Sequence, residues 1–166
     1  MPFGPEKQTH PFAPVFDAHS RVLVLGTFPS VRSRAAAFYY GHPRNRFWPV
    51  LAALCGQPVP ETRAQKEALL LANGVALWDV LASCEITGSA DGSIRDPQPN
   101  DIAALLAQAP IRAVYANGQT AARLYARYCE PLTGVPAVAL PSTSPANAAW
   151  SLEKLIAAWQ VLLKQA

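Results

Sequence analysis

Four short apolar runs, each leading into glycine or polar residues, constrain the fold of this 166-residue chain more than any other feature. Such runs are typical of strands that are buried on both faces of a sheet. Helical patterns lie between and after them. Strands that alternate with helices predict an α/β fold, a three-layer α/β/α sandwich around a central, mainly parallel four-stranded sheet. The predicted strands cover residues 21–26, 74–80, 111–116 and 136–140, and the helices residues 46–54, 62–72, 101–109, 118–128 and 152 onward.

Chain length and composition indicate a single globular domain over residues 1–166. Hydrophobic residues make up 51% of the chain and charged residues 15%, which excludes a disordered protein. No apolar run is long enough to span a membrane, and the first ten residues lack the pattern of a secretory signal. The three separated cysteines favour a reducing compartment. We therefore expect a cytoplasmic monomer with no membrane association.

Polar or glycine-containing segments follow each predicted strand. Residues 26–30, 117–119 and 141–145 follow the first, third and fourth strands, and a long polar connection over residues 83–100 follows the second. A connection of that length in a compact domain is usually a functional or mobile loop. Because ligands of open α/β sheets bind at the carboxyl ends of the strands, these segments predict a binding site at that edge.

Positive charge is concentrated in one part of the chain. The net charge is only +3, but residues 18–60 contain five arginines and no acidic residue. Aromatic residues are interleaved with these arginines between residues 38 and 48. Cations suit a phosphate backbone and rings suit bases, so the segment is typical of a nucleic-acid groove. A solvated basic face above core aromatic residues would have the same composition.

Several common site signatures are missing. The chain has no glycine-rich phosphate-binding motif, no dinucleotide-binding motif and no nucleophile elbow. His10, His19 and His42 do not have metal-ligand spacing with the cysteines. We therefore expect neither a metal nor another cofactor.

Three segments together resemble a known family. They are VLVLGTFPSVRSRAAAFYYGHPRNRFWPVLAAL at residues 22–54, VYANGQTA at residues 114–121 and LPSTSPANA at residues 140–148. They resemble the uracil-DNA glycosylase superfamily, and within it most closely the hypoxanthine-DNA (deoxyinosine) glycosylases. The resemblance implies a base excision repair enzyme that acts on DNA containing deaminated bases. Such an enzyme flips the base out of the duplex, hydrolyses its N-glycosidic bond and leaves an abasic site.

The resemblance also implies a role for particular residues. Asn45 matches the catalytic asparagine and would position the attacking water through its side-chain carbonyl. Tyr40 would stack on the flipped base, and Gln119 or Asn117 would read its edge. Gly26, Thr27 and Phe28 would line the base pocket. The residues expected to contact DNA are Pro29, Ser30, Arg32, Arg34, Arg44, Arg46, Ser142, Thr143, Ser144 and Pro145.

Each of these residues also has a plain structural explanation. An asparagine can be a loop or cap residue, a tyrosine can be a core ring that exchanges roles with Phe38 or Tyr39, and a glutamine can begin a helix. Asp79 and Glu85 border the predicted site from the second strand and are reserve candidates for an acid or base.

Two departures from the family pattern bear on the substrate. Phe28 and Leu140 stand where uracil glycosylases have polar groups, which predicts that hypoxanthine is released in preference to uracil. No lysine lies in the matched motifs, so we expect a monofunctional hydrolase without a Schiff-base step. A uracil or mismatch-specific glycosylase and a non-catalytic DNA-binding module of the same fold are the alternatives.

Overall fold

The computed structural model describes residues 6–10, 13–28, 38–86 and 91–164. At its centre is a four-stranded sheet in the order β3-β2-β6-β7, in which every neighbouring pair is parallel. Its strands lie within two residues of the predicted bounds at every end. They are β2 (Val22–Gly26), β3 (Val75–Asp79), β6 (Ala113–Asn117) and β7 (Ala137–Leu140).

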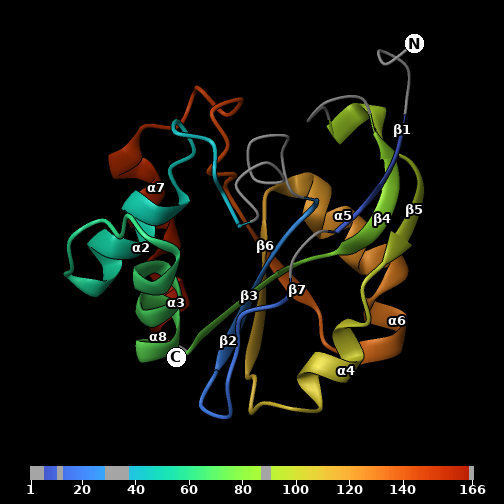
Figure 1. Cartoon of the computed structure of the whole chain (residues 1–166), viewed down its shortest axis with the longest axis horizontal. Helices are drawn as coiled ribbons and strands as arrows, with labels where there is room; N and C mark the ends of the chain where they lie inside the picture. The colour runs from blue at the N-terminus through green and yellow to red at the C-terminus, as the bar shows by residue number, and fades with distance from the viewer. Residues whose placement is uncertain (1–5, 11–12, 29–37, 87–90, 165–166) are drawn as a thin grey trace.

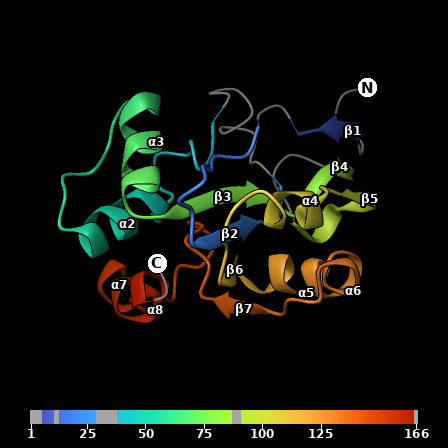
Figure 2. The same cartoon turned by 90° about the horizontal axis from the view of Figure 1, so that it is seen from below.

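Helices cover both faces of this sheet, as Figures 1 and 2 show. Alternate residues of β2 pack into two separate cores, with Val22 and Val24 on one face and Leu23 and Leu25 on the other. The predicted α/β/α sandwich is therefore confirmed. The first face carries α2 (Phe47–Cys55), α3 (Arg63–Ala72), α7 (Leu152–Trp159) and α8 (Val161–Lys164), and the second carries α4 (Ile102–Leu106), α5 (Gln119–Tyr128) and α6 (Glu130–Thr133).

Helix starts follow local sequence signals closely. Thr62 and Gln65 have the spacing of a capping box and form one at the start of α3, with the Thr62 side chain accepting a hydrogen bond from the Gln65 backbone. Helix α4 ends at Leu106 and is therefore shorter than the helix predicted over residues 101–109. Asp101 caps its start, and the Asp101 carboxylate accepts a hydrogen bond from the Ala104 backbone N–H.

The prediction of a long loop over residues 83–100 is wrong. Strand β4 (Leu81–Ile86) runs into this segment and β5 (Arg95–Pro99) closes it, with a short 3₁₀ turn at Asp91–Ser93 between them. Together with β1 (Glu6–Thr9) they form an antiparallel sheet in the order β1-β4-β5. The β5 strand is polar, exposed and contains two prolines, so it lacks the apolar alternation by which an edge strand is recognised.

The three cysteines of the chain are reduced in the fold. Cys84 and Cys129 are buried and Cys55 is partly buried, and none of the three forms a disulfide. Burial raises the pKa of the Cys129 thiol to about 11, which keeps this thiol protonated and unreactive at neutral pH. In the described part of the chain, no helix has the length and apolar character needed to cross a bilayer.

Candidate active site

The carboxyl ends of the four parallel strands lie along one edge of the sheet. Gly26 at the end of β2 is in register with Asp79 at the end of β3, and Asn117 of β6 is in register with Leu140 of β7. Polar side chains from these strand ends, together with the segment 40–46 that precedes α2, form a buried cluster. Because the strands are parallel, residues distant in sequence meet here as expected.

Because Gly26 has no side chain, two oxygen atoms lie unusually close to its backbone. A Cβ atom at this position would lie 2.3 Å from Asp79 Oδ1 and 3.0 Å from the Tyr40 hydroxyl. The first distance is shorter than any real contact, so only glycine fits here. Asp79 Oδ1 and the Tyr40 hydroxyl therefore border the same small space above the end of β2.

Tyr40 has a strained backbone and a buried hydroxyl. Its φ is 53°, in the left-handed region that a residue with a bulky side chain seldom adopts. One face of its ring stacks on Phe47, with 4.3 Å between centroids. Its hydroxyl is buried without a well-formed hydrogen bond among the described residues. Buried polar groups normally have partners, so this hydroxyl is a candidate for contact with a ligand.

The Tyr40 hydroxyl remains neutral. Burial and then the nearby Asp79 charge raise the pKa of Tyr40 well above its usual value, and the Asn117 amide offsets this only in part. A neutral phenol can donate a hydrogen bond. Phe38 and Tyr39, which could have exchanged roles with Tyr40, are buried in the core beside α2.

Asp79 is a buried carboxylate held by His10. Asp79 is 3% exposed, and its Oδ2 lies 2.8 Å from His10 Nε2. An ionised carboxylate only accepts hydrogen bonds, so Nε2 carries the proton and donates. The two residues are 69 positions apart in sequence.

The sequence predicted Asp79 only as a reserve candidate and assigned no role to His10. The one sequence signal for Asp79 is an acid at the end of an otherwise apolar strand. Glu85, the other reserve candidate, lies on β4 of the small antiparallel sheet.

Asn45 is fixed by a chain of hydrogen bonds. Its Oδ1 accepts from the Phe47 backbone N–H and from the Thr143 hydroxyl, both at 2.9 Å. Thr143 is fully buried, and its hydroxyl accepts in turn from Asn117 Nδ2 at 3.0 Å. The Thr143 backbone N–H donates to Asn117 Oδ1, also at 3.0 Å. The direction of each hydrogen bond follows from the backbone N–H groups of Phe47 and Thr143, which can only donate and so identify the oxygen of each amide.

The water-positioning role expected of the Asn45 carbonyl is therefore revised. A side-chain carbonyl has two lone pairs, and the Phe47 and Thr143 bonds use both. The polar group of Asn45 that has no partner among the described residues is the amide nitrogen Nδ2. Asn45 is thus arranged to donate a hydrogen bond at this site and not to accept one.

Arg46 holds the segment that follows β7. Its guanidinium donates to the backbone carbonyls of Ser144 and Asn147, both at 3.1 Å, and to that of Trp150. These bonds use three of the five N–H groups of the guanidinium, so the phosphate contact predicted for Arg46 stays a prediction that rests on the other two. Arg44, in contrast, is exposed.

The serines of the same segment keep a donor for a ligand. Ser142 Oγ accepts from the Ser144 backbone N–H, and Ser144 Oγ accepts from the Ala146 backbone N–H, each at 3.1 Å. Both hydroxyl hydrogens can therefore still be donated to a phosphate oxygen. Pro145, which follows Ser144, is exposed.

Comparison with known proteins places this arrangement in a family. The model of the uracil DNA glycosylase superfamily matches residues 13–163. The chain belongs to this superfamily. The predicted family and the predicted activity class, a DNA glycosylase, are confirmed.

Two relatives of this superfamily member carry a more specific name. The hypoxanthine DNA glycosylase of Methanosarcina acetivorans is 33% identical over 145 residues, which cover 84% of this chain and 89% of that protein. The hypoxanthine DNA glycosylase of Methanosarcina barkeri is 34% identical over 110 residues, or 65% of this chain and 70% of that protein. A solution NMR structure from M. acetivorans, whose protein is described as a uracil DNA glycosylase, superposes with a TM-score of 0.76 and 31% identity over 91% of this chain and 96% of that chain.

The remaining predicted residues of this superfamily member lie in different surroundings. Thr27 is buried, and Phe28 is half-buried with its ring edge-on to His10, so their place in the wall of a base pocket stays a prediction. Gln119 is exposed at the start of α5, in a pocket of about 500 Å³ that Ser142 and Ser144 also line. The Asn117 amide is engaged with Thr143. The predicted contacts at Pro29, Ser30, Arg32 and Arg34 lie outside the described residues.

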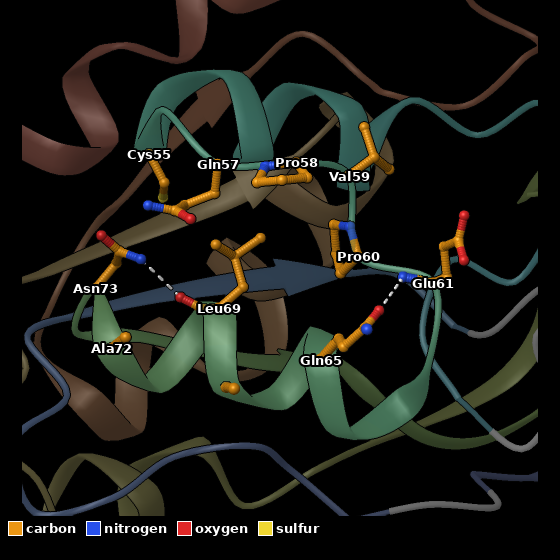
Figure 3. Close-up of a pocket in the computed structure, with 11 residues that line it drawn as sticks. Cys55, Gln57, Pro58, Val59, Pro60, Glu61, Gln65, Leu69, Ala72 and Asn73 are labelled. Carbon is orange, nitrogen blue, oxygen red and sulfur yellow. Dashed lines mark hydrogen bonds between the residues drawn. The ribbon is translucent and has the colours of Figure 1, made fainter.

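A larger pocket of about 780 Å³ lies elsewhere, between the end of α2 and helix α3 (Figure 3). Its wall is mainly apolar, and two of its polar side chains form hydrogen bonds at the ends of α3. Gln65 accepts from the Glu61 backbone, and Asn73 donates to the Leu69 carbonyl. None of the predicted site residues lines it. In the described part of the chain, no cluster of three or more His, Cys, Asp or Glu side chains could hold a metal ion.

Proposed function

We propose that this protein is a monofunctional DNA glycosylase that removes hypoxanthine from deoxyinosine in DNA by hydrolysis and leaves an abasic site. The observation that supports hypoxanthine as the substrate base is that Asp79 Oδ1 and the neutral Tyr40 hydroxyl both lie next to Gly26. The names of the two Methanosarcina relatives point to the same base. Its partner is DNA containing deaminated bases, and we expect it to act as a monomer in the cytoplasm.

The pair suits the edge that deamination creates. Deamination of adenine replaces a ring nitrogen acceptor and an amino donor with a ring N–H donor and a carbonyl acceptor. Asp79 Oδ1 would accept from the ring N–H, and the Tyr40 hydroxyl would donate to the carbonyl. Adenine would instead turn a lone pair toward the Asp79 carboxylate, which is repulsive. A site built to satisfy both groups of the lactam edge rejects bases that lack them.

Uracil presents the same lactam edge, so a uracil glycosylase is the second candidate function. The two residues that argue against it are Phe28 and Leu140, which are apolar where uracil glycosylases have polar groups. Leu140 is 5% exposed and Phe28 is half-buried, and neither side chain can orient water or bind a pyrimidine carbonyl. We therefore expect excision of hypoxanthine to exceed excision of uracil.

Asn45 is the proposed catalytic residue, in the role of a donor. As the bond between the sugar and the base breaks, positive charge develops on the sugar and the electron pair moves to the base. A fixed Nδ2–H aimed at the departing base would stabilise that negative charge. Water then adds to the sugar carbon and releases a proton. None of the four lysines lies in residues 26–30, 40–46, 117–119 or 141–145. Lys7 lies on β1, Lys66 packs over the Trp48 ring, and Lys154 and Lys164 lie on α7 and α8. This supports hydrolysis without an imine.

Exposed Arg44 and the hydroxyls of Ser142 and Ser144 are the proposed phosphate contacts among the described residues. Arg44 lies next to Asn45 in the chain, so a phosphate bound there would be close to the catalytic amide. The serine hydroxyls lie on the segment that Arg46 holds in place. Such contacts position the duplex without reading its sequence.

The deciding experiment is single-turnover excision from matched duplexes with one deoxyinosine, deoxyuridine or deoxyxanthosine, followed by alkaline cleavage of the abasic sites. An undamaged duplex is the control. We expect hypoxanthine to be released fastest. Faster release of uracil would favour the second candidate, and binding without release of any base would identify a DNA-binding module.

A further inference from the structure

His10 links the first strand of the small sheet to the candidate active site. It follows β1, and its backbone N–H donates to the Ala82 carbonyl of β4 at 2.6 Å. Its side chain then extends to Asp79 at the end of β3, with 2.8 Å between Nε2 and Oδ2. Both side chains are almost fully buried, at 4% and 5% exposure.

The bond determines which oxygen of Asp79 is available. A buried carboxylate is stable only when it accepts hydrogen bonds, so its orientation depends on the donors around it. His10 occupies Oδ2, so Oδ1 is the oxygen directed at the space above Gly26. The ring of His10 is itself held, edge-on to Phe28 at 6.1 Å and tilted against Tyr39 at 5.8 Å. Its orientation is therefore set by packing.

A purely structural role explains this pair poorly. Replacing both partners of a buried polar pair with apolar side chains of the same shape can be nearly neutral or stabilising. Two neighbours of His10, Phe28 and Tyr39, are aromatic, so what distinguishes histidine from an apolar ring at this position is the donor that it supplies to Asp79. The other ionisable groups facing Asp79 from the described elements, Tyr39 and Tyr40, stay neutral because burial raises the pKa of each.

We propose that His10 is a positioning residue for base recognition, which holds Asp79 so that Oδ1 accepts the ring N–H of a lactam base. This inference rests on the proposed function. It requires no direct contact between His10 and the base.

The test measures recognition separately from catalysis. Duplexes carry either 2′-fluoroarabino-inosine or 2′-fluoroarabino-purine, whose base lacks both the N1–H and the 6-carbonyl. The fluorine resists cleavage by opposing positive charge on the sugar. The ratio of the two dissociation constants then reports the lactam contacts alone. A hydrogen bond to a charged group contributes roughly tenfold or more to such a ratio.

We expect His10→Phe to lower this ratio by about tenfold, while His10→Gln, which keeps an N–H donor, retains most of it. Asp79→Ala should lower the ratio to the same extent, and His10→Phe should then add nothing in the Asp79→Ala background. Tyr39→Phe is the matched control. It removes a hydroxyl that donates to the Ala13 carbonyl beside the His10 ring, so it can cost stability but should leave the ratio unchanged.

Several outcomes would overturn the inference. One is a wild-type ratio in His10→Phe, and another is equal losses in His10→Phe and His10→Gln. If His10→Phe does not fold, the comparison of His10→Gln with Asp79→Ala decides, because only the second should lose the ratio. Failure of the wild-type protein to release hypoxanthine from unmodified deoxyinosine would contradict the proposed function instead.

Discussion

The Thr143 hydroxyl donates a hydrogen bond to Asn45 Oδ1 at 2.9 Å, across 98 positions of sequence. The contact joins the segment after β7 to the segment before α2. Because the Asn117 amide already donates to this hydroxyl, the direction of the Thr143 bond is determined, and with it the orientation of the Asn45 amide. Asn45 therefore offers its Nδ2–H groups to a ligand.

Replacing Asn45 distinguishes a donor from a water acceptor. In Asn45→Asp the new carboxylate can still accept from Phe47 and Thr143, but it cannot donate. We expect both Asn45→Asp and Asn45→Ala to lower the single-turnover rate on deoxyinosine by about 10²–10³, with DNA binding within a few-fold of wild type. Near wild-type cleavage by Asn45→Asp would restore the water-positioning role. Near wild-type cleavage by Asn45→Ala would make Asn45 structural.

Thr143 should act through its hydroxyl. Thr143→Val keeps the shape of the side chain but leaves Asn117 Nδ2 and Asn45 Oδ1 each short of one partner. We expect a loss of about 1–3 kcal/mol in the free energy of unfolding, measured by denaturant titration, together with slower base release. Thr143→Ser retains the hydroxyl and is the matched control, with a rate close to wild type. Equal rates for the valine and serine variants would contradict the relay.

The Tyr40 hydroxyl can be tested without removing its ring. Tyr40→Phe keeps the stack on Phe47 and any stacking on the base, but removes the buried hydroxyl. If the hydroxyl donates to the base carbonyl, this variant should release hypoxanthine about tenfold more slowly at subsaturating DNA. An unchanged rate would leave Tyr40 with the stacking role alone. A thermal unfolding curve for each protein is the control for folding.

Arg44 and Arg46 should behave differently although they are two residues apart. Arg44→Ala should weaken DNA binding and reduce the slope of log affinity against log salt by about one. Arg46→Ala should mainly destabilise the protein, because three backbone carbonyls lose their donor, and Arg46→Lys should not restore them. A change of salt slope in Arg46→Ala as large as that in Arg44→Ala would show that Arg46 does contact phosphate.

Stability should fall in alkali because of the buried tyrosines. Burial, together with the charge of Asp79, raises the pKa of both Tyr39 and Tyr40 in the folded protein. Above about pH 10 these residues lose protons in the unfolded chain but keep them in the fold, so unfolding is favoured as pH rises. We expect the free energy of unfolding, measured between pH 8 and pH 11, to decline above about pH 10. Tyr39→Phe should make this decline shallower, and an unaltered slope would contradict the assignment.

Local patterns in the sequence determined the layers of the fold. The apolar runs predict β2, β3, β6 and β7, and Thr62 and Gln65 predict the start of α3, because burial on both faces and helix capping depend on residues close together in the chain. The three matched segments, of which FYYGHPRNRFW is the most specific part, were sufficient to identify the family, since the order of their residues carries that information without the fold.

Only the tertiary structure decided which polar atoms remain available at the site. Arg46 meets Ser144 and Asn147, Asn45 meets Thr143, and Asp79 meets His10, each pair between about 70 and 100 positions apart. No local period predicts such partners, because they depend on how separate elements pack. For the same reason, the sequence did not predict the pairing of β4 with β1 and β5. A hydrogen-bond donor or acceptor is usable for chemistry only when the fold has left it without a partner, and that is a property of distant residues brought together.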